Sequence, residues 1–336
     1  MKIGNKVVSE DELFFWVEEG QASLGNLEIA LKYIQTVSEI GADGIEFQLA
    51  IPEEFFINSH PALEHYKKIQ YTSQQIKQLV QFAKKLNISF LATVLSSSLL
   101  PELREYGCDA FVINASDINN PGIIDPIIES KVPFFISLPL ASEEEIDWIV
   151  YRCKEKGAEN FVLMQGQHTM ASGEHGVMPE DSNLGFIQTM KSKYKLPVGY
   201  IDHSTSSVMP SIARAAGANF ISKHLVLDKK DKGPDWFVCQ EPKEMEATIA
   251  FTRKISGSLT VKRKVLAPGE HVDKTVMRRS IVAADFITKG TIIKSDMFTF
   301  KRPGTGISPS LCKELIGLKL NRNVQKDELL TFEMFE

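Results

Sequence analysis

The chain has 336 residues, of which 43% are hydrophobic and 24% charged, and its formal net charge is −5. This composition is typical of a soluble globular protein, and the acidic balance argues against a nucleic-acid-binding protein, which needs a clustered basic surface. The length predicts about two domains, because a β/α barrel alone can take about 250 residues.

Apolar runs of strand length alternate with amphipathic helical patterns through most of the chain. Helical patterns lie between the strand candidates, for example at residues 26–40 and 73–86. Alternating strands and helices predict a parallel sheet, and eight such units predict a closed (β/α)8 TIM barrel. The eight expected strands are residues 14–18, 44–49, 89–95, 110–113, 133–138, 160–164, 197–201 and 220–225.

The pattern changes after a last expected helix at about residues 242–255. Residues 256–258 (Ser-Gly-Ser) and the basic residues 262–264 resemble a linker. Further on, short β-like segments and Gly/Pro turns dominate, which predicts a small β-rich domain with a marginal core. We therefore expect a barrel at residues 1–257, a linker at 258–267 and a small domain at 268–336.

No targeting or membrane segment is expected. Residues 1–6 contain no apolar signal core, and no apolar run approaches the roughly 20 residues that span a bilayer. The cysteines are scattered without paired spacing, which indicates free thiols in a cytoplasmic protein. They are Cys108, Cys153, Cys239 and Cys312.

Two histidines near the ends of the last two expected strands are candidates for the functional site. His203 follows residues 197–201, and His224 lies in residues 220–225. Barrel enzymes carry their chemistry at the C-terminal ends of the strands, so both imidazoles are expected at that rim. The polar loop at residues 228–235 follows immediately and is typical of a binding loop. The other interpretation is a pair of hydrogen-bonded histidines with no ligand.

Three motifs in the same order resemble those of the N-acetylneuraminate (sialic acid) synthase family. Residues 199–204 resemble its "GxSDHT" strand, residues 222–225 with 233–235 resemble "EKHFT…GPD", and residues 301–307 resemble "KRPGxGI". The resemblance covers nearly the whole chain. It implies a TIM barrel followed by an antifreeze-like (SAF) domain.

The resemblance also implies an activity. Family members condense phosphoenolpyruvate with an N-acylated aminosugar to give a nonulosonic acid, in surface polysaccharide biosynthesis. By resemblance, Mn²⁺ or Mg²⁺ would be held by His203 and His224, where it would act as a Lewis acid. A domain-swapped homodimer is also implied, in which Arg302 reaches the pocket of the partner, and Asp235 and Arg302 would contact the sugar.

Matches at other strand ends supply further site candidates. Glu18 and Asp117 are candidates for acid/base roles or for support of the metal, and solvated strand-end carboxylates are the other interpretation. The candidates for contact with the acid substrate are Gln48, Thr93, Ser137 and Lys223.

Several positions that hold the phosphate in the family are changed here. The lysine of the second strand is Glu46, that of the fourth strand is Val112, and residues 169–176 replace a "YPTP" loop near His168 and His175. Two like charges ~4 Å apart repel by about 4 kcal/mol at an effective dielectric of 20, so an ionised Glu46 would oppose an anionic substrate.

Two other functions therefore stay open. The first is a metal-dependent aldolase or lyase that acts on a sugar or oxo acid and does not use phosphoenolpyruvate. The second is a non-catalytic relative that binds a sugar. Retention of both histidines weighs against the second function, because a non-catalytic scaffold does not need a pair of metal ligands.

Overall fold

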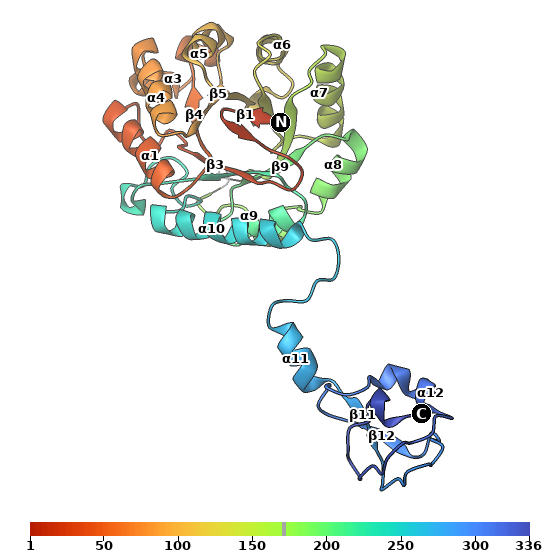
Figure 1. Ribbon diagram of the computed structural model, residues 1–336. Coiled ribbons are helices and arrows are strands. Elements are labelled where there is room, and N and C mark those ends of the chain that lie inside the picture. Colours follow the sequence, from red (N-terminus) through yellow and green to blue (C-terminus); the bar gives the residue numbers. More distant parts are fainter. Residues whose placement is uncertain (170–172) are drawn as a thin grey trace. The chain divides into compact units, whose positions relative to one another are not determined.

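The computed structural model describes residues 1–169 and 173–336, and the chain divides into two compact units, Met1–Thr260 and Val261–Glu336. Figure 1 shows the helices of the first unit arranged around its strands. Residues 170–172, part of the segment that replaces the family's "YPTP" loop, lie outside the described residues.

The first unit is a closed barrel of eight parallel strands in the order β10-β3-β4-β5-β6-β7-β8-β9, which confirms the predicted fold. Because helices cover the outside and side chains fill the inside, the strands are buried on both faces and are apolar nearly throughout. They are β3 (Phe14–Glu18), β4 (Gly44–Leu49), β5 (Ser89–Val94), β6 (Ala110–Ile113), β7 (Phe134–Ser137), β8 (Phe161–Gly166), β9 (Val198–Asp202) and β10 (Phe220–His224).

Helices follow the strands and bury their apolar faces against them. Side-chain caps fix where two of them begin: Thr72 and Ser142 each form a capping box with the residue three positions on, which satisfies otherwise unpaired amides. The helices are α1 (Leu27–Glu39), α2 (Pro52–Phe55), α3 (Leu63–Ile69), α4 (Ser73–Lys85), α5 (Leu100–Tyr106), α6 (Pro121–Glu129), α7 (Glu143–Glu155), α8 (Phe186–Tyr194), α9 (Met209–Ala215) and α10 (Pro242–Leu259).

Aromatic side chains fill the barrel interior toward the N-terminal ends of the strands. The ring of Phe135 lies 4.7 Å from that of Trp16 and 5.4 Å from that of Phe220. A hairpin of β1 (Lys2–Ile3) and β2 (Lys6–Val7), which the sequence did not predict, adds Ile3 to this cluster. Apolar groups occupy this end of the interior, so the polar side chains inside the barrel lie toward the C-terminal ends of the strands.

The predicted linker is wrong at its start, because residues 256–258 continue helix α10 to Leu259. Ser256 is buried and accepts a hydrogen bond from Nε of Arg214 at 2.9 Å, and this contact holds the last turns of the helix in place. A Ser-Gly-Ser sequence favours a loop locally, but tertiary contacts override that preference here.

The second unit is small and has its own apolar core, which includes Ile281, Leu320 and Leu330. Strands β11 (Ser280–Ala283) and β12 (Phe298–Lys301) pair antiparallel, and isolated bridges extend this β structure. Helices α11 (Glu270–Met277) and α12 (Cys312–Leu315) were not predicted. The β segments agree with the expected β-rich domain.

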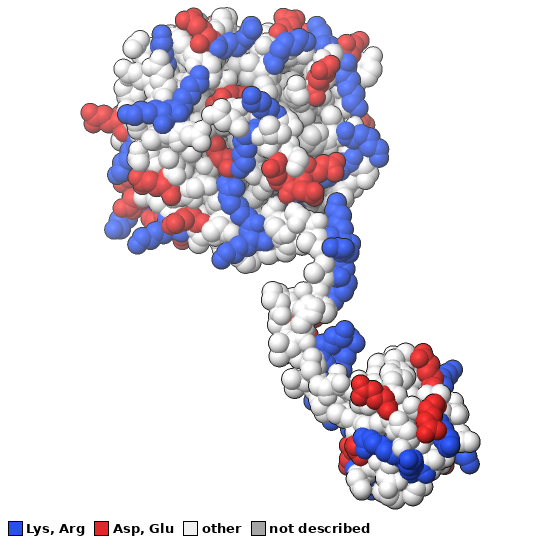
Figure 2. Space-filling model, in the orientation of Figure 1, with Lys and Arg blue, Asp and Glu red and all other residues white. Residues whose placement is uncertain are grey.

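Charges of both signs are interspersed over the visible face of the first unit (Figure 2). All four cysteines are free, as predicted. In the described part of the chain, no helix combines the length and the apolar character needed to cross a membrane.

Candidate active site

A cavity of about 150 Å³ lies at the C-terminal ends of the barrel strands. Side chains along a strand alternate between inside and outside, so the residues two positions after the apolar interior layer face this cavity. Glu18 follows Trp16 in this way, and Glu46 follows Gly44, which pairs with Trp16; Gln48 lies a further two positions on. The lining residues are Glu18, Glu46, Gln48, Val112, Asn114, Ala115, Ser116, Ser137, Pro139, Leu140, His168, Ile201, His203, His224 and Asp235.

The cavity brings together six of the residues that were expected at the site. They come from five strand ends and from the loop after β10, and they are Glu18, Gln48, Ser137, His203, His224 and Asp235. The strand register places His224 directly opposite Glu18, and Glu18 directly opposite Glu46.

Four other expected residues do not line this cavity. Thr93 is buried and donates to Oε1 of Glu46, and Asp117 accepts from Ser116 Oγ and Asn120 Nδ2, both at 2.8 Å. Roles for these two in catalysis or substrate binding stay predictions.

Lys223 and Arg302 are likewise engaged elsewhere. Nζ of Lys223 is fully buried, 2.7 Å from Asp202 Oδ2 and 2.8 Å from the carbonyl oxygen of Ser204. Arg302 belongs to the second unit, where its Nε donates to the carbonyl of Met277 at 2.8 Å. Their expected contacts with substrate stay predictions.

The imidazoles of His203 and His224 lie side by side, with ring centroids 5.3 Å apart. Burial lowers the pKa of both, that of His203 well below its ordinary value, so both rings are neutral near pH 7. Nδ1 of His203 lies 2.7 Å from the carbonyl oxygen of Gln167 and must carry the proton, which leaves the lone pair on Nε2. Gly20 packs against His224, where a Cβ would lie 2.6 Å from Nδ1.

Glu18 is a buried carboxyl group beside these histidines. Burial raises its pKa to about 7, although Gln48 Nε2 donates to Oε1 at 2.7 Å and thereby favours the ionised form. Its Oε2 lies 3.4 Å from Nε2 of His224. A carboxyl group with a pKa near 7 can both take up and release a proton at neutral pH, which suits general acid/base work.

Glu46 does not carry the full negative charge that its sequence position suggested. Burial raises its pKa to about 8, with Glu18 as a further cause, so the group is mostly protonated at pH 7. Trp16 Nε1 donates to Oε2 at 2.6 Å, and Thr93 holds the other oxygen. The expected repulsion of about 4 kcal/mol assumed an ionised group and is therefore too large for the free site.

The donors present at the cavity suit a divalent cation. Neutral imidazoles are common metal ligands. Their second ring nitrogen usually donates a hydrogen bond to a carbonyl or carboxylate oxygen, which orients the ring, as at His203. Within residues 1–169 and 173–336, no group of three or more His, Cys, Asp or Glu side chains is arranged to hold an ion. The chain would thus supply two ligands, His203 and His224, and substrate or water would complete the set.

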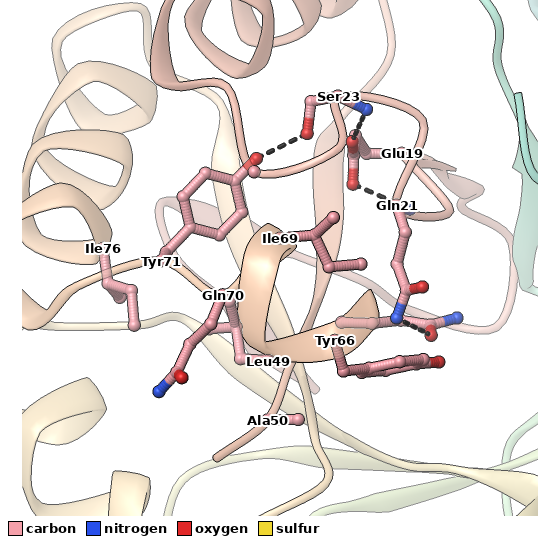
Figure 3. A pocket seen from close by; sticks show the side chains of 12 residues that line it. Glu19, Gln21, Ser23, Leu49, Ala50, Tyr66, Ile69, Gln70, Tyr71 and Ile76 are labelled. Atoms are coloured by element: carbon pink, nitrogen blue, oxygen red, sulfur yellow. Dashed lines mark hydrogen bonds between the residues drawn. The ribbon is translucent and has the colours of Figure 1, made fainter. Parts of the chain in front are cut away.

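A second, smaller cavity of about 30 Å³ adjoins the first, and Gln48 lines both. In Figure 3, Glu19 binds the loop that contains Gln21 and Ser23, and Ser23 contacts Tyr71. Nε2 of Gln21 donates to Oε1 of Gln48 at 3.3 Å. A chain of amides therefore connects the second cavity to Glu18.

Asn114 and Ser116 line the cavity, although neither was singled out from the sequence. Strand alternation contained the signal for Asn114, because it lies two positions after the inward-facing Val112. Ser116 lies in the short 3-10 helix Ala115–Asp117, whose geometry no local pattern predicts. His168 also reaches the cavity, with its ring 5.2 Å from that of His203.

Protein-family models and known proteins match this chain over nearly its whole length. Residues 33–264 match the model of the NeuB family, and residues 278–336 match that of the SAF domain. An uncharacterized protein of Methanocaldococcus jannaschii is 28% identical over 334 residues, which are 99% of this chain and 98% of that protein.

Relatives with named activities show similar coverage. The N,N'-diacetyllegionaminic acid synthase of Campylobacter jejuni is 29% identical over 93% of this chain and 97% of its own. The crystal structure of N-acetylneuraminic acid synthetase from Leptospira borgpetersenii, in complex with citrate, has a TM-score of 0.74 and 30% identity, covering 81% of this chain and 94% of that one.

Proposed function

The chain belongs to the NeuB family, and on this premise we propose that it is a nonulosonic acid synthase that uses a divalent metal. It would join a three-carbon acid to the aldehyde carbon of an N-acylated aminosugar. The named relatives support the class of reaction. The observation that carries the proposal is the single cavity that combines His203, His224 and Glu18.

The residues of the cavity have distinct tasks in this proposal. His203 and His224 would hold the cation, which supplies Lewis-acid polarisation of the aldehyde oxygen. Glu18 exchanges a proton with the reacting atoms, and Gln48 orients it through the 2.7 Å hydrogen bond. Ser137, Asn114 and Ser116 offer neutral hydrogen-bonding groups to the acid.

Asp235 and Arg302 would bind the sugar. Asp235 lines the cavity from the loop after β10, and its carboxylate suits sugar hydroxyl groups. Arg302 would act within a domain-swapped homodimer, as the family resemblance implies. We further propose a cytoplasmic role in polysaccharide biosynthesis.

Phosphoenolpyruvate and an unphosphorylated 2-oxo acid are the two candidate donors. Phosphoenolpyruvate has an additional phosphate group, which adds about two negative charges to the site. Both would give a carbon–carbon bond at the same cavity.

Product formation tests the proposal. The Mn²⁺-loaded protein is incubated with N-acetylmannosamine, or its 2,4-diacetamido-6-deoxy counterpart, together with both candidate donors, and nonulosonic acid is sought by mass spectrometry. We expect product from the wild type and from His65→Ala, whose histidine is exposed and outside the cavity. The His203→Ala/His224→Ala double variant should form none. Absence of product from every combination would contradict the proposed function.

A further inference from the structure

We propose that Gln21 is a positioning residue for the reaction, which acts through Gln48 to fix the direction of the Glu18 carboxyl group. The inference rests on the proposed function, in which Glu18 exchanges a proton with the reacting atoms. It goes further by assigning a task to a residue that lines the second cavity and not the first. A chain of three side chains carries it, together with the loop that holds Gln21 in place.

The chain of hydrogen bonds runs from the loop after β3 to the candidate acid/base group. Nε2 of Gln21 donates to Oε1 of Gln48 at 3.3 Å, and Nε2 of Gln48 donates to Oε1 of Glu18 at 2.7 Å. The other oxygen of Glu18, Oε2, lies 3.4 Å from Nε2 of His224. Because Gln48 holds one oxygen, the second stays directed toward the histidine side of the cavity.

The amide of Gln48 has two possible directions, and Gln21 favours one of them. An amide group offers an oxygen that accepts and an NH2 group that donates, whereas an ionised carboxylate only accepts. If the Gln48 amide were reversed, its oxygen would face the Glu18 carboxylate and its NH2 group would face that of Gln21. Both contacts would then be repulsive. The donor of Gln21 therefore keeps the NH2 group of Gln48 on Glu18.

The backbone of Gln21 is held in a conformation that is otherwise unfavourable. Its φ is 60°, in the left-handed region that residues with a side chain adopt rarely. The buried carboxyl group of Glu19 accepts from the backbone N–H of Gln21 at 3.0 Å and also from that of Ser23 (Figure 3). The carbonyl oxygen of Gln21 accepts from the N–H of Leu24 at 3.0 Å. Such conformations persist only where surrounding bonds hold them, and they are frequent at functional sites.

The loop that contains Gln21 is also fixed at both ends. A Cβ at Gly20 would lie 2.6 Å from Nδ1 of His224, and a Cβ at Gly25 would lie 2.5 Å from the carbonyl oxygen of Ile69. The backbone therefore packs directly against the metal-site histidine on one side and against the end of α3 on the other. This close packing sets the distance between Gln21 and the cavity that contains Glu18.

The side chain of Gln21 is not what holds the loop together. The bonds within the loop use the backbone N–H and carbonyl of Gln21, whereas its amide group bonds to Gln48 on the neighbouring strand β4. Replacement of the side chain should thus leave the loop folded and release the Gln48 amide. This difference separates a positioning role from a purely structural one.

Kinetics of two variants at Gln21 test the inference. Gln21→Asn introduces a residue that adopts the left-handed region readily, but its shorter side chain does not reach Gln48. With the Mn²⁺-loaded protein, kcat should fall about tenfold, because the acid/base group is displaced, while KM and Mn²⁺ affinity should change less than twofold. Gln21→Met has nearly the same length without a donor and should behave alike. Gln70→Met, at an exposed position of the second cavity, is the matched control and should keep the wild-type kcat.

A double variant separates action through Gln48 from any other effect. If Gln21 acts only through Gln48, Gln21→Asn combined with Gln48→Met should be no slower than Gln48→Met alone. If the two losses multiply instead, Gln21 acts independently of Gln48 and the inference is overturned. Circular dichroism checks that each variant is folded.

The amide of Gln48 provides a readout that needs no activity. Its side-chain NH2 signals in the ¹⁵N-labelled protein are identified by their loss in Gln48→Met. We expect these protons to exchange with water at least fivefold faster in Gln21→Asn than in the wild type, because the oxygen of the amide is no longer held. Gln70→Met should leave the exchange rate unchanged.

The outcomes separate this inference from the proposed function. If the wild type forms product, and both kcat and the exchange of the Gln48 amide are unchanged in Gln21→Asn and Gln21→Met, the inference alone is overturned. If the wild type forms no nonulosonic acid while the exchange responds to Gln21→Asn, the proposed function fails and the chain of amides stands. A tenfold loss of kcat that disappears in the Gln48→Met background supports both.

Discussion

Nε2 of His224 lies 3.4 Å from Oε2 of Glu18, at the point where the last strand of the barrel pairs with the first. The two residues are far apart in the sequence, and the register of β10 on β3 sets them directly opposite each other. Closure of the barrel therefore assembles the site, and it places the candidate acid/base group beside a candidate metal ligand.

Replacement of either cavity histidine is expected to weaken metal binding strongly. His203→Ala and His224→Ala should each weaken Mn²⁺ affinity at least 100-fold, because only two ligand side chains would come from the chain. The free Mn²⁺ signal in electron paramagnetic resonance measures this directly. The exposed His65→Ala is the matched control, and an equal loss in that variant would contradict the assignment.

Gln48→Met is expected to shift the pH dependence of the reaction. The amide of Gln48 stabilises ionised Glu18, so its loss should raise the pKa of Glu18 above about 7. The acidic limb of the pH–rate profile should then move to higher pH. Gln35→Met, on the exposed surface of α1, should leave the profile unchanged. An unshifted profile in Gln48→Met would mean that Glu18 does not limit the rate.

Glu46 is expected to make the folded protein less stable as the pH rises. Its pKa is raised from 4.5 to about 8 on folding, so its stabilising contribution is complete below pH 4.5 and is lost as the pH approaches 8. Between pH 5.5 and 8.5 the wild type should lose on the order of 3 kcal/mol relative to Glu46→Gln. Urea unfolding at both pH values measures this, and parallel stability curves would contradict it.

Lys223→Met should act on stability, in contrast to its expected role in substrate binding. Breaking the fully buried pair with Asp202 leaves an uncompensated charge and should cost about 3–5 kcal/mol. Lys193→Met breaks the solvent-exposed pair with Asp147 and should change the free energy of unfolding far less, because water screens exposed ion pairs. Equal unfolding free energies for the two variants would show that the buried pair is not needed for the fold.

Arg302→Ala should impair use of the sugar and leave metal binding intact. If Arg302 contacts the sugar in a dimer, its loss should raise the KM for the aminosugar about tenfold, the effect of one lost interaction of roughly 1.4 kcal/mol. Arg278→Ala, which removes another exposed arginine of the second unit, is the control. Equal KM values for the wild type and Arg302→Ala would remove Arg302 from the site.

The barrel was predictable because its strands are apolar on both faces and alternate with amphipathic helices. All eight strands were found within a few residues of their true ends, as at β3 and β4, where the bounds agree. The hairpin β1–β2 and the end of α10 were missed because tertiary contacts of Ile3 and Ser256 stabilise them. Such contacts leave no local pattern in the sequence.

The site was predictable only in part for a related reason. Strand ends locate Glu18, His203 and His224, because alternation and closure fix where they point. The protonation state of Glu46 depends on its burial beside Trp16 and Thr93, which sequence position alone cannot supply. The direction of Lys223 followed from alternation, yet motif resemblance suggested a substrate contact.

The most direct test of the account is a single competition reaction followed by mass spectrometry. The metal-loaded wild type receives an N-acylated aminosugar with equal amounts of [¹³C₃]pyruvate and unlabelled phosphoenolpyruvate. We predict a nonulosonic acid from the wild type, whose ¹³C content identifies the donor, and none from the His203→Ala/His224→Ala double variant. Absence of a nonulosonic acid from the wild type, or equal product from the double variant, would contradict the account.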